Sequence, residues 1–327
     1  MKRHLPWLLL FAALVVLPFV GFSTYMMHIF ILVLMWSIIG MSWNILGGYT
    51  GQVSFGHAAF FGLGAYTAGI LNHHLGLSGW WGLPLSLPLV AAFCLIMGFI
   101  VLRLRGAYFS LATLAVGEVL RVTAQNLDKL TLGDRGILAP RTWVEKNPYY
   151  FIILLLALGA FLVQKKLAES KMGYFFVAIR ENQDAAESMG IDTTFYKTIA
   201  LAISGVLTGV AGAFYFNYMG YIDPKVVFDL PGLSIMAIMV VMIGGVATYA
   251  GPLIGAVIMV LLQEMVRALP AIPVTLAGKA FTIPKPGPAS QTLFGILLIV
   301  MIIIVPNGIA GDWAKIKKRI FRPGRAV

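Results

Sequence analysis

Apolar runs of about 20 residues recur along this chain of 327 residues, and no other feature limits its fold as strongly. A helix needs a run of about that length to cross roughly 30 Å of hydrocarbon. The chain is 59% hydrophobic and only 11% charged, whereas soluble domains average about 25% charged residues. A soluble globule of this size could not bury so much apolar surface. The sequence therefore predicts one bundle of membrane helices spanning residues 1–327.

Ten of these runs are predicted to cross the membrane, so the expected fold is all-α and polytopic. They are Leu5–Phe22, Met26–Leu46, Val53–Leu71, Leu83–Leu102, Ala107–Gln125, Tyr149–Val163, Phe195–Met219, Leu233–Ala247, Pro252–Leu269 and Thr292–Val305. The third and eighth are the weakest, because they are short or rich in glycine. The basic start before the first run is typical of a signal peptide, but no small-x-small cleavage site follows, so we expect this run to remain attached.

Basic residues predict the orientation, because cytoplasmic loops of membrane proteins carry an excess of Lys and Arg. With ten spans and an internal N-terminus, 15 basic residues fall inside and 8 outside. The inside residues are Lys2, Arg3, Arg103, Arg105, Lys165, Lys166, Lys171, Arg180, Lys197 and the six in the basic tail 312–327. We therefore expect both termini and the loop 164–194 in the cytoplasm. Contact with anionic membrane lipid accounts for the net charge of +11, and no soluble basic domain is expected to bind nucleic acid.

A glycine-rich polar segment, residues 44–62, lies between the second and third runs. Glycine permits irregular backbone, which at membrane depth is tolerated only against protein or water. The residues predicted to form a helix break or to line a translocation path are Gly51, Gln52, Ser54, Gly56 and His57. A turn that satisfies its own hydrogen bonds explains the same residues equally well. No second ligand stands at metal-binding spacing from His57, so neither a metal nor another cofactor is expected.

One pair of opposite charges lies inside a predicted span. Glu118 and Arg121 are three residues apart in the fifth run, and charges within a membrane are costly and usually paired. Glu118 is therefore a candidate for the wall of a path or a gate. The favoured interpretation is a structural ion pair near the outer interface.

The loop 164–194 has helical character in its centre. Apolar Val177, Ala185 and Met189 recur at multiples of four residues, and Gly190 provides a helix stop. A short amphipathic helix lying across the cytoplasmic ends of a bundle is a natural docking element for a partner. The alternative is a helix at the membrane surface that contacts no partner.

Three blocks within residues 35–265 resemble a known family. Asp184-Ala185-Ala186-x-x-x-Gly190 resembles the EAA loop of ATP-binding-cassette (ABC) importer permeases, with Asp in place of the leading Glu. The strings 48–64 and 234–256 are similar to the M-type subunit of branched-chain amino-acid permeases. The resemblance implies that the loop forms a coupling helix that docks on an ATPase. The residues implied in coupling are Arg180, Glu181, Asp184, Ala185, Ala186 and Gly190.

The resemblance also implies partners and a function. The expected assembly is a heterodimer with a homologous permease, two cytoplasmic ABC ATPase subunits and a periplasmic substrate-binding protein in a bacterial inner membrane. The expected cargo is leucine, isoleucine or valine, while urea, amides and other amino acids stay open. No G-x-x-x-x-G-K-[ST] phosphate loop or catalytic constellation is present, so the chain is not expected to be an enzyme. An ion-coupled transporter is the other alternative, but it would bury more ionisable residues than Glu118 and His57.

Overall fold

The computed structural model describes residues 5–268, 272–276, 279–283, 295–296 and 308–311. Helical elements dominate it. Their bounds are α1 (Leu5–Val16), η1 (Leu17–Val20), α2 (Thr24–Trp43), η2 (Asn44–Tyr49), α3 (His57–Leu75), η3 (Gly79–Trp81), α4 (Gly82–Val101), α5 (Ala107–Asn126), α6 (Asp128–Thr131), η4 (Gly133–Arg135), α7 (Asn147–Ala168), α8 (Lys171–Glu181), α9 (Gln183–Ser188), α10 (Thr193–Met219), α11 (Pro224–Val227), η5 (Leu230–Ile235), α12 (Met236–Gly244), α13 (Gly251–Ala268) and α15 (Gly308–Gly311).

Two short antiparallel sheets accompany the helices in the part of the chain that the structure describes. β1 (Ile137–Leu138) pairs with β2 (Tyr221–Ile222), and Ile137 stands opposite Ile222. β3 (Ile272–Leu276) pairs with β4 (Lys279–Ile283). The β1–β2 pair ties the segment after α5 to the C-terminal end of α10.

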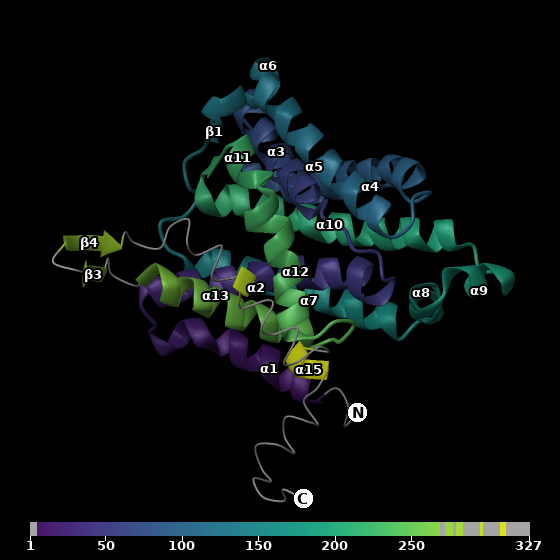
Figure 1. Ribbon diagram of the computed structural model, residues 1–327. Coiled ribbons are helices and arrows are strands. Elements are labelled where there is room, and N and C mark those ends of the chain that lie inside the picture. The colour runs from purple at the N-terminus through teal and green to yellow at the C-terminus, as the bar shows by residue number, and fades with distance from the viewer. Residues whose placement is uncertain (1–4, 269–271, 277–278, 284–294, 297–307, 312–327) are drawn as a thin grey trace, which may run out of the picture.

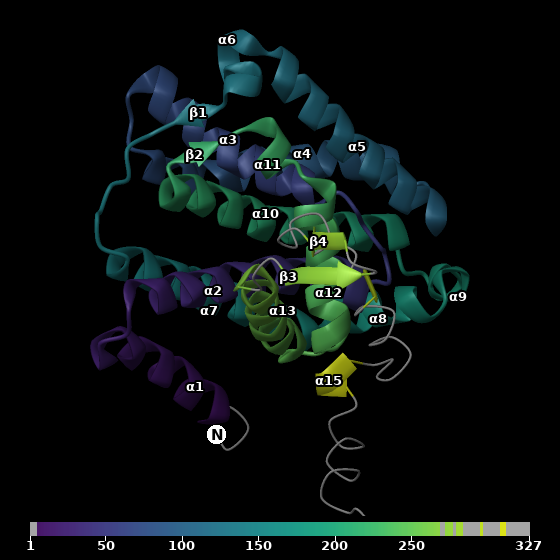
Figure 2. The same ribbon diagram turned by 60° about the vertical axis from the view of Figure 1, so that its left-hand side comes forward.

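The long helix α10 lies in the middle of the bundle. It packs against α3 and α4 on one side and α2 on the other, while α2 also contacts α7, α12 and α13 (Figures 1 and 2). The contact between α3 and α10 depends on glycine. A Cβ added at Gly64 would lie 1.8 Å from the Gly209 carbonyl oxygen, so the two backbones touch in the way that small residues allow between membrane helices.

Six helical segments among the described residues are long and apolar enough to cross a membrane. They are Thr24–Tyr49, Gly79–Val101, Ala107–Asn126, Asn147–Ala168, Thr193–Met219 and Pro224–Gly244. Each overlaps a predicted run, although Pro224–Gly244 begins nine residues before the run Leu233–Ala247. A helical, multi-pass membrane bundle is therefore supported. Helices α1, α3 and α13 also lie at predicted runs, and most of α3 from His57 to Gly69 is buried inside the bundle. The predicted run 292–305 lies almost wholly outside the described residues, so the total of ten stays a prediction.

Helix α12 differs from the other predicted spans in its direction. It crosses α2 and α10 steeply in both views, whereas α2, α7 and α10 run side by side (Figures 1 and 2). The eighth predicted run, Leu233–Ala247, contains this helix, and it was among the weakest of the ten.

Candidate functional site

The single helix expected in the loop 164–194 is in fact two helices. α8 ends at Glu181 and α9 begins at Gln183, with Asn182 extended between them at φ −158°. The Asn182 Oδ1 accepts a hydrogen bond of 3.0 Å from the Ala185 backbone N–H. Asn is a strong N-cap residue because its side chain satisfies a free N–H of the first turn. The prediction of one continuous helix was therefore wrong at Asn182.

The prediction that Val177, Ala185 and Met189 form the apolar face of that helix is also wrong. The residues of α8 that contact the bundle are Gly173, Phe176 and Ile179, and all three are buried. In α9 only Ala186 is buried, with 4% exposure, whereas Ala185 is exposed and Met189 is 83% exposed. The tip of α9 therefore presents an apolar side chain to the outside of the described chain.

Gly190 ends α9 as its position predicts. Its φ of +82° lies in the left-handed region, where a residue with a Cβ is strained. The Gly190 N–H donates to the Glu187 carbonyl at 2.9 Å, and the Ile191 N–H donates to the Ala186 carbonyl at 3.1 Å. These two bonds close the last turn as in a Schellman motif.

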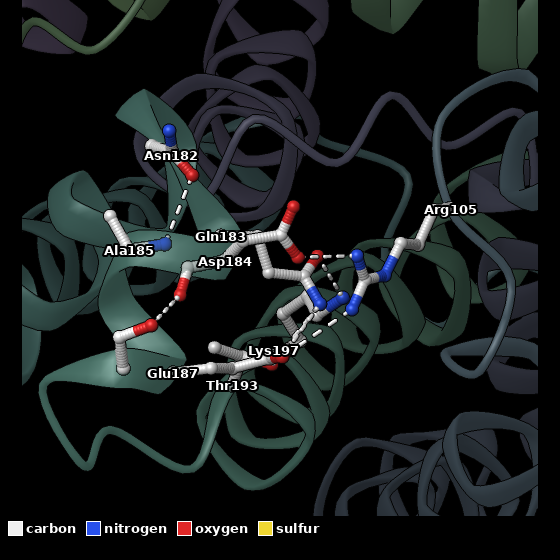
Figure 3. Close-up of polar contacts among 9 residues, drawn as sticks. Arg105, Asn182, Gln183, Asp184, Ala185, Glu187, Thr193 and Lys197 are labelled. Atoms are coloured by element: carbon white, nitrogen blue, oxygen red, sulfur yellow. Dashed lines mark hydrogen bonds and ion pairs between the residues drawn. The ribbon is translucent and has the colours of Figure 1, made fainter.

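A charged cluster holds α9 against the rest of the chain (Figure 3). Arg105, which precedes α5, donates from Nη1 to Asp184 Oδ1 at 2.6 Å and from Nη2 to Glu187 Oε2 at 3.4 Å. Gln183 Nε2 and Thr193 Oγ1 donate to Glu187 Oε1 at 2.8 and 2.6 Å. This cluster was not predicted, because Arg105 is 79 residues from Asp184 in the chain.

Hydrogen bonding shifts the ionisation of this cluster. Bonds from Gln183 and Thr193 hold the pKa of Glu187 below its usual range, and the bond to Asp184 raises the pKa of Arg105. Arg105 and Asp184 are both more than half exposed, and solvent and salt screen the attraction between exposed charges. The cluster therefore fixes the direction of α9 more than it stabilises the fold.

Arg180 joins the loop 164–194 to the glycine-rich segment 44–62. Its Nη1 donates to the Gly48 carbonyl at 3.2 Å, while its Nη2 contacts Glu181 Oε1 at 2.7 Å. The Arg180 side chain also crosses over Gly51, where an added Cβ would lie 2.8 Å from Arg180 Cγ. Gly51 has a φ of +71°. The glycine there thus permits both the turn and the close approach of Arg180.

An irregular segment lies between α2 and α3, where the sequence predicts a helix break or a turn. η2 is a π-helix at the end of α2, and residues 50–56 are not helical. Such π-helical turns are rare and occur frequently at functional sites. Gln52 donates its N–H to the Leu46 carbonyl at 3.1 Å, and the Gly56 N–H donates to Ser54 Oγ at 3.1 Å. The Phe55 N–H donates to Thr113 Oγ1 of α5 at 3.0 Å. The break is thus held by hydrogen bonds within the protein.

His57 begins α3 and is buried in a polar cluster that joins three helices. Its Nε2 lies 2.9 Å from Ser204 Oγ of α10. Ser42 of α2 donates to the Ser204 carbonyl at 2.5 Å and lies 2.5 Å from Thr208 Oγ1. These contacts lock α2, α3 and α10 together near the end that carries α8. Among the described residues, no group of His, Cys, Asp and Glu is placed to hold a metal ion.

Glu118 is not part of this arrangement. It lies on α5 and pairs with Arg121 through two contacts, one of them 2.9 Å between Arg121 Nε and Glu118 Oε2. Its side chain is 52% exposed. Glu118 and Arg121 therefore form a local ion pair between residues one helical turn apart.

A cavity of about 620 Å³ opens at the other end of the bundle. It was not expected from the sequence. Its lining comes from α2, α3, α10, α11, η5 and α13, and the segment before α7 adds two cations. The lining residues are His28, Leu32, Met35, Trp36, Phe61, Arg141, Lys146, Tyr215, Tyr218, Met219, Lys225, Val226, Asp229, Gly232, Leu233 and Arg267. Its volume lies within the range of about 300–1,000 Å³ found for small-molecule sites.

Comparisons with known proteins agree with these features. The chain is 28% identical over 302 residues to the high-affinity branched-chain amino acid transport system permease protein LivM of Salmonella typhimurium, covering 83% of this chain and 67% of the relative. Identity to LivM of Escherichia coli is 27% over 308 residues, covering 85% and 68%. A probable permease protein LivH of Methanocaldococcus jannaschii is 30% identical over 235 residues, covering 71% and 67%. No solved structure matches the chain.

The family comparison covers most of the chain and includes both candidate regions. Residues 25–306 match the model described as "Branched-chain amino acid transport system / permease component". That span includes the helix break, the α8–α9 segment and the described residues that line the cavity. Relatives named as permease components are transport proteins and not enzymes. The chain therefore belongs to the family of permease components of branched-chain amino acid transport systems.

Proposed function

We propose that this chain is a transmembrane permease subunit of an ABC importer that carries leucine, isoleucine and valine across a bacterial inner membrane. The observation that carries the proposal is the placement of α9. An exposed helix is fixed by the Arg105 cluster at the end of α10 and is joined through Arg180 to the helix break. The permease names of the relatives support the cargo.

The α8–α9 segment is the element that couples the bundle to ATP hydrolysis. Ala185 of α9 and Met189, which follows its last residue, are exposed and provide a small apolar surface for a groove on a partner. Arg180 links this segment to the Gly48 carbonyl, and Glu181 pairs with Arg180. Two cytoplasmic ABC ATPase subunits supply the hydrolysis, and the permease itself needs no cofactor.

The proposed topology has about ten membrane helices with both termini in the cytoplasm. The excess of basic residues on the side of the loop 164–194 supports that orientation. A homologous permease completes the translocation path as a heterodimer, and a periplasmic binding protein delivers the cargo. Transport proceeds by alternating access, in which the two states differ in their contacts with the partners.

The helix break and the buried polar cluster form the inner closure of the path. Gly51, Gln52, Ser54 and Gly56 allow the chain to change direction there. His57 joins α3 to α10 below the floor of the cavity. A movement of α8 would be transmitted directly to this closure, because Arg180 of α8 is hydrogen-bonded to the backbone of η2.

Uptake into vesicles that contain the chain and its partner subunits tests the function. We expect ATP-dependent accumulation of radiolabelled L-leucine, with competition by isoleucine and valine. Competition by urea or acetamide in their place would assign the chain to a permease for amides. Accumulation driven by a proton or sodium gradient, without ATP, would assign it to the ion-coupled transporters.

A further inference from the structure

Helix α5 exposes a charged pair in the middle of a segment that can cross a membrane. The side chains of Glu118 and Arg121 are 52% and 29% exposed. The 20 residues of α5 make a helix about as long as the hydrocarbon layer is thick. Glu118 lies about 12 Å from the nearer end of the helix, at Asn126. The carboxylate therefore stands well inside the membrane and not at its surface.

The exposed residues of α5 form one stripe along the helix, because they recur every three or four residues. The stripe consists of Tyr108, Leu111, Ala115, Glu118, Val122 and Asn126. The opposite face of α5 is buried at Phe109, Thr113 and Gly117. Figure 2 shows α5 at the edge of the bundle, where it contacts α3, α4, α11 and η5. The stripe is thus left uncovered by the described part of the chain.

The neighbouring helix α4 provides the contrast that a lipid-facing surface would show. Every exposed residue of α4 between Pro84 and Ile100 is Pro, Leu, Ala, Ile or Phe. Among the six described segments that can cross a membrane, α5 is the least apolar. A charge inside a membrane is costly, and charged side chains there usually face protein or a water-filled cavity. We therefore expect the exposed face of α4 to meet lipid and the stripe of α5 to meet something else.

Irregular backbone lies beside the same helix. Ser110 Oγ of α5 donates a hydrogen bond of 2.7 Å to the Val53 carbonyl, and residues 50–56 are not helical. Gly51 and Val53 are exposed. Within a membrane, backbone outside helices is tolerated only against protein or water. A second feature at α5, independent of the charged pair, thus requires a covering other than lipid.

Apolar residues around the charged pair favour protein over water as that covering. Leu111, Val119 and Val122 are 62%, 63% and 44% exposed. A water-filled path would leave these side chains in water, whereas a partner helix would bury them. Ala115 is small, and small residues let membrane helices approach closely.

We propose that the stripe of α5 is the surface on which a second permease subunit packs within the membrane. The partner supplies a membrane helix that fits over Ala115 and brings hydroxyl or amide groups to the Glu118–Arg121 pair, since a charged pair forms strong hydrogen bonds with such groups. The inference rests on the proposed function for the identity of the partner. The need for a covering of protein rests on α5 alone.

Photo-crosslinking in the assembled complex tests which neighbour the stripe meets. Tyr108 of the stripe and Phe99 of α4 are both exposed aromatic residues, at 73% and 66%, so they form a matched pair. Each is replaced in turn by p-benzoylphenylalanine, which keeps an aromatic ring. Light should join the Tyr108 variant to the second permease subunit, as identified by mass spectrometry of the product. The Phe99 variant should be joined to lipid.

The other products have definite meanings. A product of the Tyr108 variant with lipid alone, or of the Phe99 variant with the second permease subunit in its place, would overturn the proposal. A product of the Tyr108 variant with another copy of this chain would support the stripe as an interface and contradict the heterodimer of the proposed function.

Two exposed alanines provide a steric test. Ala115 lies in the stripe and Ala92 on the exposed face of α4. Ala115→Trp should lower the amount of second permease subunit that co-purifies about fivefold or more, because overpacking a close contact is destabilising. Ala92→Trp should leave that amount unchanged, because lipid adapts to the larger ring. Equal recovery with both variants would overturn the interface.

Water access and uptake separate the remaining alternatives. Val144 is fully exposed, and the native Cys94 is buried. In the assembled complex, Ala115→Cys should react with a charged thiosulfonate far more slowly than Val144→Cys. Equal rates would show that the stripe lines a water-filled path, which overturns the interface. ATP-dependent leucine uptake without the Tyr108 product would support the proposed function and overturn this inference, and the product without uptake would do the reverse.

Discussion

Arg180 Nη1 donates a hydrogen bond of 3.2 Å to the carbonyl oxygen of Gly48, across 132 residues of sequence. The bond joins the end of α8 to η2, which continues α2. The left-handed Gly51 makes room for the Arg180 side chain beside it. The element that would meet an ATPase thus touches the irregular backbone at the end of a membrane helix.

Replacing Arg180 should uncouple transport from ATP hydrolysis. We expect Arg180→Met to lower ATP-dependent leucine uptake about tenfold, because a hydrogen bond from a charged group contributes about 1.5–3 kcal/mol. ATP hydrolysis by the assembled complex should persist. Arg103→Met is the control, since Arg103 lies near the same end and covers the Phe99 ring at 4.6 Å. Equal uptake in the two variants would contradict a role for Arg180 in coupling.

Two adjacent alanines in α9 should behave differently. Ala186 is 4% exposed, so Ala186→Arg buries a charge and should destabilise the purified subunit by about 3 kcal/mol or more. Ala185 is exposed, so Ala185→Arg should leave stability within about 0.5 kcal/mol of the original but prevent binding of the ATPase subunits. Thermal unfolding and co-purification measure the two effects. Normal co-purification of Ala185→Arg would show that this face of α9 is not the docking surface.

Gly190 should tolerate no side chain. Because its φ is +82°, Gly190→Ala should cost about 1–2 kcal/mol of stability. Gly159→Ala is the matched control: Gly159 lies inside α7 with open space around it, and a helical Gly→Ala change stabilises by about 0.5–1 kcal/mol. The melting temperatures of the two variants should therefore move in opposite directions. A shift in the same direction would contradict the helix stop at Gly190.

The Arg105 cluster should release α9 only in acid. Hydrogen bonds from Gln183 and Thr193 lower the pKa of Glu187 below the usual value of about 4.3. A carboxyl group with a lowered pKa stabilises the fold above its ordinary pKa and loses that effect as pH falls through the folded value. A fluorophore on Met189→Cys should keep constant anisotropy from about pH 8 to pH 5 and become mobile below about pH 4.

Glu187→Gln is the control for this pH dependence. The amide keeps an oxygen that accepts the bonds from Gln183 and Thr193 but does not titrate. The acid transition should weaken in this variant. A rise in mobility between pH 8 and pH 5 in the original chain would contradict the role of Glu187.

The sequence predicted the bundle well because apolar length is a local property. The ranges of α2, α4, α5, α7 and α10 follow directly from runs that match the thickness of a bilayer. The break at Asn182 was missed, although an Asn followed by Asp184 in the first turn is itself a helix-start signal. The i/i+4 spacing of apolar residues predicts one helix, whereas the cap at Asn182 starts a second one.

Contacts between distant residues were beyond the reach of the sequence. The sequence around Arg105 and Arg141 does not indicate that Arg105 holds α9 or that Arg141 lines a cavity. Glu118 is a charge in a predicted span, and among the described residues it pairs with Arg121 on the same helix. Periodicity identifies which residues share a face but not which faces meet.

The most direct test of the account compares leucine uptake by the original chain and by Ala185→Arg in vesicles with partner subunits. We predict that the original chain accumulates leucine only when ATP is present on the side of α9. Ala185→Arg should insert in the membrane in equal amount and accumulate none. Equal ATP-dependent uptake by both, or uptake by the original chain without ATPase subunits, would contradict the claim that α9 couples this permease to ATP hydrolysis.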